Sequence, residues 1–181
     1  MQIRKDHDVL SREVSALKSK MVRIQDGVKK DFESCVEEFQ GRVTRLNNLI
    51  FHGVPEQTSG TIEERNKWDK SQIDSIMDNL NIVGVAVSDC KRIGKSQVGR
   101  PRLLKITVSD VNKKNEILKK ASSLRNTDSC KRIFVHQDLT PYQQAQEKKL
   151  RDELKMRRQN GEDVVIYRGK VIRRSCIQNF Q

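Results

Sequence analysis

Apolar residues recur at steps of four and three positions along residues 1–46, a segment that contains no proline. The spacing holds from Leu10 to Val28 and resumes, offset by one residue, from Phe32 to Leu46. Such an alternation places an apolar stripe along a helix and is typical of a coiled coil, and the offset locally unwinds a supercoil without ending it. We predict that residues 1–46 form a self-associating coiled-coil helix. A lone amphipathic helix packed on its own domain is the alternative. The apolar stripe is compatible with a coiled coil of two helices or of three.

Residues 47–137 alternate between strand and helix patterns. Four apolar runs predict strands: residues 49–54, 87–93, 103–108 and 132–136. Thr61 and Glu64 form a capping box that opens a helix, and Asp110 can cap a second one. We expect the apolar face of the first helix to comprise Trp68, Ile73, Ile76, Met77 and Leu80. The order βαββαβ predicts a ferredoxin-like domain, with both helices on one face of the sheet and the other face open to a ligand.

Residues 138–181 predict a small C-terminal domain. Thr140 followed by Pro141 favours the start of a helix, and Gly161 supplies its end. Two β-branched runs joined by Arg168-Gly169 then predict a hairpin. We expect this piece to dock on the preceding domain or on its symmetry mates. The predicted fold class is α+β: a coiled-coil helix, a ferredoxin-like domain of the RNA recognition motif type, and a small helix-plus-hairpin domain.

The charge of the chain is uneven. The 181 residues carry a formal net charge of +12. From Lys91 to Arg132 there are thirteen Lys and Arg residues against three Asp and Glu residues, whereas residues 47–90 carry three against seven. A basic block of this kind favours a polyanion, because neutralised phosphates release counterions. A solvated basic face without a ligand is the plainer alternative.

Motifs for catalysis or metal binding are not found. Four cysteines are scattered without a C-x-x-C pair, and neither a P-loop nor a nucleophile elbow occurs. His52 and His136 can approach each other in a βαββαβ sheet, but no carboxylate or cysteine has metal-ligand spacing to them. The N-terminus is charged where a signal peptide is apolar, and no apolar run is long enough to cross a bilayer. We expect a soluble, intracellular protein that is not an enzyme and needs no cofactor.

Comparison with the RNA recognition motif predicts how the open face works. That motif stacks bases on aromatic residues of its central strands. Here Ile50 occupies the usual aromatic position, Phe51 is expected to face the core, and the third strand has no aromatic residue. Base stacking is therefore expected to be largely unavailable, and binding to be electrostatic and sequence-tolerant. The residues expected to make these contacts are Lys91, Arg92, Lys95, Arg100, Arg102 and Lys105.

Three motifs, taken in order, resemble a known family. They are residues 45–56 (RLNNLIFHGVPE), the basic stretch at 91–95 (KRIGK) with Arg100-Pro101-Arg102, and Asp138-Leu139-Thr140 before the last helix. In this order they resemble the first-open-reading-frame protein of LINE-type non-LTR retrotransposons. That resemblance covers nearly the whole chain and rests on the succession of coiled coil, atypical RNA recognition motif and small C-terminal domain.

The resemblance implies a homotrimer that coats single-stranded RNA, chiefly the element's own messenger, and acts as a nucleic-acid chaperone. Single-stranded DNA is implied as a further ligand, and a cytoplasmic ribonucleoprotein, with the nucleus as a second location, as its place in the cell. By motif position, the implied contacts add residues outside the central block: Arg42, Arg45, Lys148 and Lys149. Lysine stands where the family has arginine at several places, which keeps the charge but loses the two-pronged phosphate contact.

Two other readings stay open. A coiled-coil adaptor whose ferredoxin-like domain binds an acidic protein would explain the same charge pattern without nucleic acid. A host protein derived from such an element would keep the fold in a new role. Binding to single-stranded RNA that weakens steeply with salt would distinguish a nucleic-acid-binding protein from the coiled-coil adaptor.

Overall fold

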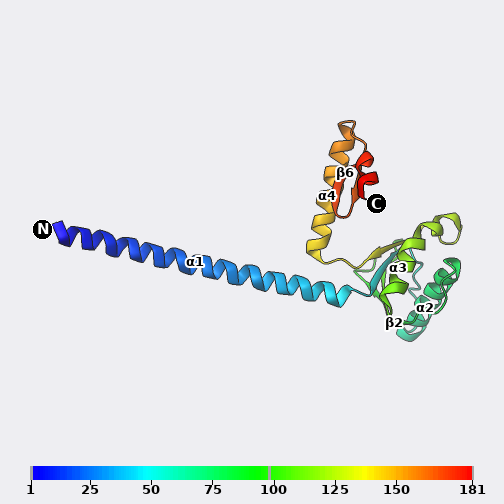
Figure 1. The fold of residues 1–181 in the computed structure, drawn as a ribbon. Helices are drawn as coiled ribbons and strands as arrows, with labels where there is room; N and C mark the ends of the chain where they lie inside the picture. The colour runs from blue at the N-terminus through cyan, green and yellow to red at the C-terminus, as the bar shows by residue number, and fades with distance from the viewer. Residues whose placement is uncertain (1, 98, 181) are drawn as a thin grey trace. The chain divides into compact units, whose positions relative to one another are not determined.

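A computed structural model describes residues 2–97 and 99–180 (Figure 1). Its contacts divide the chain into a compact unit that ends at Val43 and a second that begins at Thr44. Met1 and Gln181, the ends of the predicted first and last segments, lie outside the described residues. The chain is α+β, with a long N-terminal helix and a four-stranded antiparallel sheet. None of the described helices combines the length and apolarity that a bilayer crossing requires.

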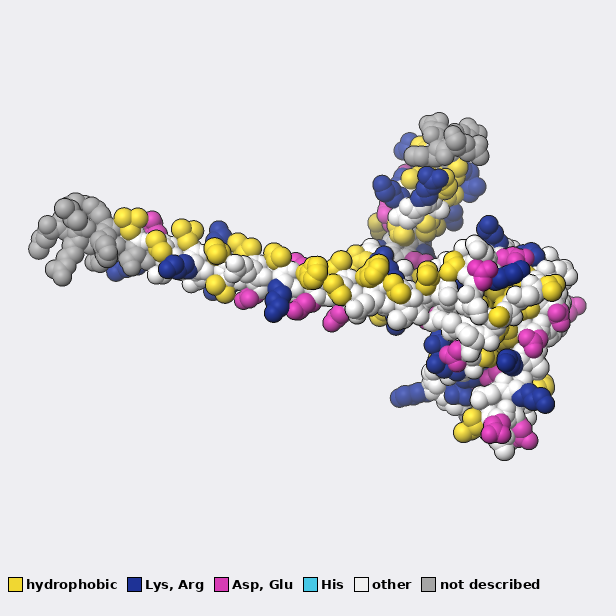
Figure 2. Space-filling view, turned by 60° about the horizontal axis from the view of Figure 1, so that its bottom comes forward, with side chains coloured by type: hydrophobic (Ala, Val, Ile, Leu, Met, Phe, Trp, Pro, Cys, Tyr) yellow, Lys and Arg dark blue, Asp and Glu magenta, His cyan; other side chains and the backbone are white. Residues whose placement is uncertain are grey.

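Helix α1 (Gln2–Arg45) carries the predicted apolar stripe on its surface. Leu17 is 65% exposed, Val28 64% and Phe32 68%, and Figure 2 shows apolar side chains gathered along one side of this helix. A contiguous exposed stripe of this kind is typical of an interaction surface. The predicted helix is confirmed, and its self-association stays a prediction.

The sheet comprises β1 (Asn48–His52), β2 (Val87–Ile93), β3 (Leu103–Val108) and β4 (Phe134–Gln137). Their spatial order is β2-β3-β1-β4, and every neighbouring pair is antiparallel. Helix α2 (Ile62–Asn79) lies between β1 and β2 in the chain, and helix α3 (Val111–Lys120), followed by the short 3₁₀ helix η1 (Ala121–Asn126), lies between β3 and β4. The predicted limits of β2 and β3 are confirmed, while β1 and β4 are each displaced by one or two residues.

The predicted helix starts are formed as expected. Thr61 Oγ1 accepts a hydrogen bond from the Glu64 backbone at 3.2 Å, and the Glu64 carboxylate accepts one from the Thr61 backbone at 2.8 Å, which completes the capping box. The Asp110 carboxylate accepts from the Asn112 backbone at 2.8 Å. Both caps satisfy amide groups that the first turn of a helix leaves without partners.

Helices α2 and α3 cover one face of the sheet and form the core with it. Leu49 and Phe51 of β1, Ile73 of α2 and Ile117 of α3 are fully buried there. The expectation that Trp68 belongs to this face was wrong, because its side chain is 41% exposed. Asp69, four residues before Ile73, points inward and is buried. Its neighbour Trp68 is therefore turned toward the edge of the helix face.

Gly53 ends β1 in a conformation that only glycine adopts easily. Its φ is +78°, and a Cβ atom added there would lie 2.2 Å from the Arg132 carbonyl oxygen. The absence of a side chain therefore lets β1 run close to the segment that leads into β4.

Helix α4 (Pro141–Gln159) is followed by the hairpin strands β5 (Val164–Tyr167) and β6 (Lys170–Arg173) and by the 3₁₀ helix η2 (Arg174–Phe180). Thr140 caps α4 as predicted, and the predicted hairpin is confirmed. Arg168 (φ 47°) and Gly169 (φ 74°) both have positive φ, as a two-residue hairpin turn requires. Helix and hairpin pack on each other over Val164, which is fully buried.

The segment before α4 is tied to the sheet through Asn48. The Asn48 amide donates to Asp138 at 2.9 Å, and its carbonyl oxygen accepts from the Thr107 hydroxyl at 2.8 Å. Arg45 adds an ion pair to Asp138 at 3.6 Å. These contacts fix the point at which the chain leaves the sheet for α4.

Candidate nucleic-acid interface

The face of the sheet opposite α2 and α3 carries the side chains that alternate with the core residues. The strand registers pair Ile50 with Lys105 and with His136, and Lys91 with Lys105. Residues paired across neighbouring strands project to the same side of a sheet. This open face therefore includes Ile50, His52, Asp89, Lys91, Ile93, Leu103, Lys105, Thr107, Phe134 and His136.

Two of the predicted contacts, Lys91 and Lys105, are neighbours on the open face. Lys91 is exposed and forms an ion pair with Asp89 at 3.0 Å, and this hydrogen bond and the charge of Asp89 raise the pKa of Lys91. Lys105 is half-buried directly opposite Lys91 in the register. Like charges opposed in this way repel each other, and an anion bound between them would remove that repulsion.

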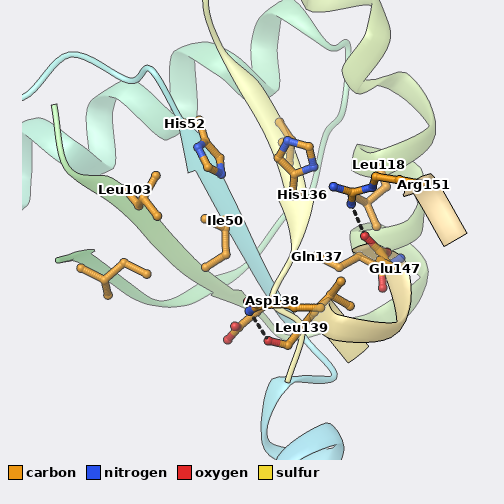
Figure 3. Close-up of a pocket in the computed structure, with 13 residues that line it drawn as sticks. Ile50, His52, Leu103, Leu118, His136, Gln137, Asp138, Leu139, Glu147 and Arg151 are labelled. Carbon is orange, nitrogen blue, oxygen red and sulfur yellow. Dashed lines mark hydrogen bonds and ion pairs between the residues drawn. The ribbon is translucent and has the colours of Figure 1, made fainter. Parts of the chain in front are cut away.

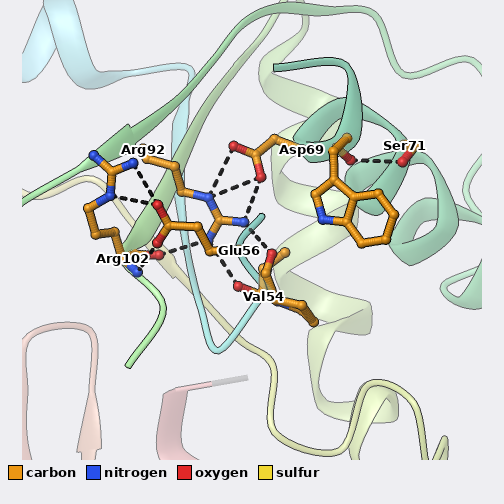
Figure 4. Close-up of polar contacts among 8 residues, drawn as sticks. Val54, Glu56, Asp69, Ser71, Arg92 and Arg102 are labelled. Carbon is orange, nitrogen blue, oxygen red and sulfur yellow. Dashed lines mark hydrogen bonds and ion pairs between the residues drawn. The ribbon is translucent and has the colours of Figure 1, made fainter. Parts of the chain in front are cut away.

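Arg92 is placed differently from the expectation, because its side chain points into the protein. The side chain is only 5% exposed, and its guanidinium forms an ion pair with Asp69 at 2.6 Å (Figure 4). The remaining donors reach the carbonyl oxygens of Val54 and Arg102, both at 2.9 Å, and of Pro55 at 2.5 Å. Because all five guanidinium donors have protein partners, Arg92 joins α2 to the segments that follow β1 and precede β3 and has no donor left for a phosphate.

Arg102 is also engaged within the protein. Its Nε donates to Glu56 at 2.8 Å, and its backbone amide donates to the other carboxylate oxygen of Glu56 at 2.8 Å. Burial alone would raise the pKa of Glu56, but the hydrogen bonds and the charge of Arg102 outweigh it and lower that pKa. The Arg102 side chain is 28% exposed, so this pair forms the partly accessible rim of the Arg92 cluster.

The other predicted residues lie on exposed positions of several elements. Lys95 and Arg100 are exposed on the loop between β2 and β3, and Lys148 and Lys149 are exposed on α4. Arg42 of α1 forms an ion pair with Glu38 at 2.7 Å, and, as described above, Arg45 contacts Asp138. The structure thus brings Lys91 and Lys105 directly together. The exposed or ion-paired residues of this paragraph are distributed over the β2–β3 loop, α4 and α1.

The two histidines meet on the open face, as their strands predicted. The ring centroids of His52 and His136 are 5.1 Å apart in an edge-to-face arrangement. Burial and the nearby His136 lower the pKa of His52, which favours its neutral form. Both rings line a cavity of about 630 Å³ whose wall also includes Ile50, Leu103 and Gln144 (Figure 3).

Phe134 is the functional candidate that the sequence analysis missed. The sequence indicates only that it lies within the predicted strand 132–136. In the structure Ile133 is buried, whereas Phe134 is 45% exposed and pairs with His52 across β1 and β4. The expectation that base stacking is largely unavailable rests on Ile50 of β1 and on β3, and Phe134 adds a ring on β4 that this expectation did not include. The signal lay in strand parity, because Phe134 is two residues from His136.

Other chemistry among the described residues is limited. No group of three or more His, Cys, Asp and Glu side chains within residues 2–97 and 99–180 is arranged to hold a metal ion. Burial, followed by the charge of Asp69, raises the pKa of the Cys90 thiol to about 11, so this thiol stays protonated at neutral pH.

Comparison with known proteins gives no relationship from which a role could be transferred. No protein-family model matches the chain. A search of curated proteins likewise gives no match.

Proposed function

We propose that this protein is a nonenzymatic single-stranded RNA- and DNA-binding protein that self-associates through α1. The observation that carries the proposal is the open sheet face, where Lys91 and Lys105 stand opposite each other on neighbouring strands. Lys95 and Arg100 extend the positive charge onto the adjoining loop, where both are exposed. Such a surface neutralises a phosphate backbone without reading its sequence.

The fold supports the same proposal. Strands and helices succeed one another as βαββαβ in the antiparallel order β2-β3-β1-β4, and neither α2 nor α3 covers the face that carries Lys91 and Lys105. We take this sheet to be a ferredoxin-like domain of the RNA recognition motif type, which binds its ligand on the uncovered face. From the residues that resemble the retrotransposon first-open-reading-frame protein, we further propose that it belongs to a cytoplasmic ribonucleoprotein that packages element RNA and acts as a chaperone.

Self-association would strengthen binding by bringing several weak sites together. The exposed apolar stripe of α1 supplies the surface for this, and the family resemblance favours three strands. Once one domain holds a strand, the next binds at a high effective concentration. Contacts to the backbone alone let strands shift and pair again, as a chaperone requires.

The test is fluorescence anisotropy of a labelled single-stranded RNA titrated with the full chain at several salt concentrations. We expect the logarithm of affinity to fall linearly with the logarithm of salt, by about 0.7 per phosphate contacted. Absence of binding at low salt would contradict the proposal. The basic face would then be assigned to an acidic protein partner, which the same protein immobilised as bait would retain.

A further inference from the structure

Three rings lie together at the β1–β4 side of the open face. Phe134 and His52 are cross-strand partners, and His136 lies two residues beyond Phe134 on the same side of β4. The His52 and His136 rings are in edge-to-face contact at 5.1 Å. Phe134 is 45% exposed, although a phenylalanine ring gains more by burial than most side chains. The arrangement offers flat apolar surfaces on a rigid sheet.

Apolar side chains continue this surface toward the middle of the sheet. Ile50, Ile93 and Leu103 line the same cavity of about 630 Å³ as the two histidines. Polar groups stand at its border, among them Gln144, whose amide donates to the Leu139 carbonyl oxygen at 3.0 Å. The lining combines these apolar side chains with polar ones, among them Asp138, Glu147 and Arg151. The volume lies within the range of sites that hold small organic molecules.

Charge is distributed differently across the two halves of the open face. The three rings lie on β1 and β4, whereas Lys91 and Lys105 lie on β2 and β3, next to Ile93 and Leu103. Ile50 stands between them, opposite both His136 and Lys105. A single nucleic-acid strand has this same division, with flat apolar bases on one side and anionic phosphates on the other. An apolar protein segment would match the rings but not the adjacent lysines.

We propose that the open face holds unpaired nucleobases by stacking on Phe134 and on the His52–His136 pair, while Lys91 and Lys105 contact the adjoining phosphates. This inference rests on the proposed function and adds a base-dependent part to it. Stacking accepts any base, because every base has a flat π face. Binding would remain tolerant of sequence and would still require that the strand carry bases.

The experiment compares two labelled strands of equal length and charge. One is oligothymidylate, and the other consists of abasic tetrahydrofuran nucleotides joined by the same phosphates. The full chain should bind oligothymidylate about tenfold more tightly or better, since each stacked base contributes enough for a change of that order. Phe134→Ala should remove most of this preference and leave the affinity for the abasic strand unchanged.

Matched variants separate stacking from general effects. Trp68→Ala removes a ring of similar exposure, 41%, from α2 on the far side of the sheet, and should change neither affinity. Lys91→Ala should weaken both strands to the same extent. Phe134→Leu keeps apolar contact without a ring and covers the case in which the alanine variant unfolds, as thermal melting by circular dichroism would reveal.

The outcomes distinguish this inference from the proposed function. Equal affinity of the unmodified chain for the two strands would overturn base stacking and leave the electrostatic proposal standing. If neither Phe134→Ala nor His52→Ala reduces the preference for oligothymidylate, base stacking on these rings is also overturned, since the bases would then be held elsewhere. Failure to bind either strand at low salt would overturn both proposals.

Discussion

The two faces of the four-stranded sheet use cations in opposite ways. On the helix-covered face, the Arg92 guanidinium is saturated by Asp69 and three carbonyl oxygens. On the open face, its neighbour Lys91 is exposed and meets another lysine across the strands. Two adjacent basic residues therefore have different surroundings: Arg92 is held within the protein, and Lys91 is the one that we propose for binding. Partners and burial therefore decide what a positive charge does.

The largest effect is expected from breaking the Arg92 cluster. Arg92→Ala leaves the Asp69 carboxylate, whose side chain is 7% exposed, buried without its partner, and removal of one member of a buried ion pair costs about 3–5 kcal/mol. Urea denaturation followed by circular dichroism measures this loss. Lys91→Ala is the control and should lie within about 0.5 kcal/mol of the unmodified protein. Similar losses for both variants would refute the division between the faces.

A second substitution tests the close approach that holds β1 near the start of β4. Gly53→Ala forces a side chain into a φ of +78° and against the Arg132 carbonyl oxygen, and should cost about 2 kcal/mol or more. Gly84→Ala also requires a positive φ but meets no atom within 4 Å, so it isolates the backbone strain from the clash. Thermal melting should rank Gly53→Ala clearly below Gly84→Ala, and the reverse order would contradict this account.

On the open face, the same comparison predicts a change in binding without a change in stability. Replacing Lys91 and Lys105 together by Ala should weaken binding to all sequences alike and reduce the salt slope by about 1.4, as expected if each lysine neutralises one phosphate of a single strand. Anisotropy at several salt concentrations measures the slope. An unchanged slope would mean that the phosphates are contacted elsewhere, such as at Lys95 and Arg100.

The smallest expected effect is a pH dependence of stability that originates at His52. Burial and the proximity of His136 lower the pKa of His52 from its ordinary value of 6.5, so the folded protein binds this proton less readily than the unfolded chain. Stability is therefore complete above about pH 6.5, declines as the pH falls through the folded pKa, and levels off below it. His52→Gln should flatten this decline in denaturation curves recorded between neutral and mildly acidic pH.

Local signals predicted the elements well, because caps and turns are decided by a few neighbouring residues. The capping box at Thr61, the helix start at Thr140-Pro141 and the Arg168-Gly169 turn all appear where the sequence indicated. Their physical causes are contained within four residues, so no knowledge of the rest of the fold was needed.

The orientation of β2 was not predictable in the same way. Val87 and Ile93 differ by an even number of positions, so simple alternation puts both on one face. The register instead shifts between Val87 and Asp89, and Val87 packs against the core while Ile93 lines the cavity on the open face. Arg92 consequently turns inward. Such a bulge depends on pairing with β3, which only the assembled sheet determines.

That bulge also bears on how the chain can change over time. Removing Ser88, the residue between the shifted positions, would remove the bulge and still leave Val87 and Arg92 on the same side of the strand, because an even number of positions would then separate them. Losing the bulge while keeping Ser88 would instead turn Lys91 toward the core and expose the arginine that holds α2. Related sequences should therefore either retain this bulge or lack one residue next to it, and should seldom straighten the strand at constant length.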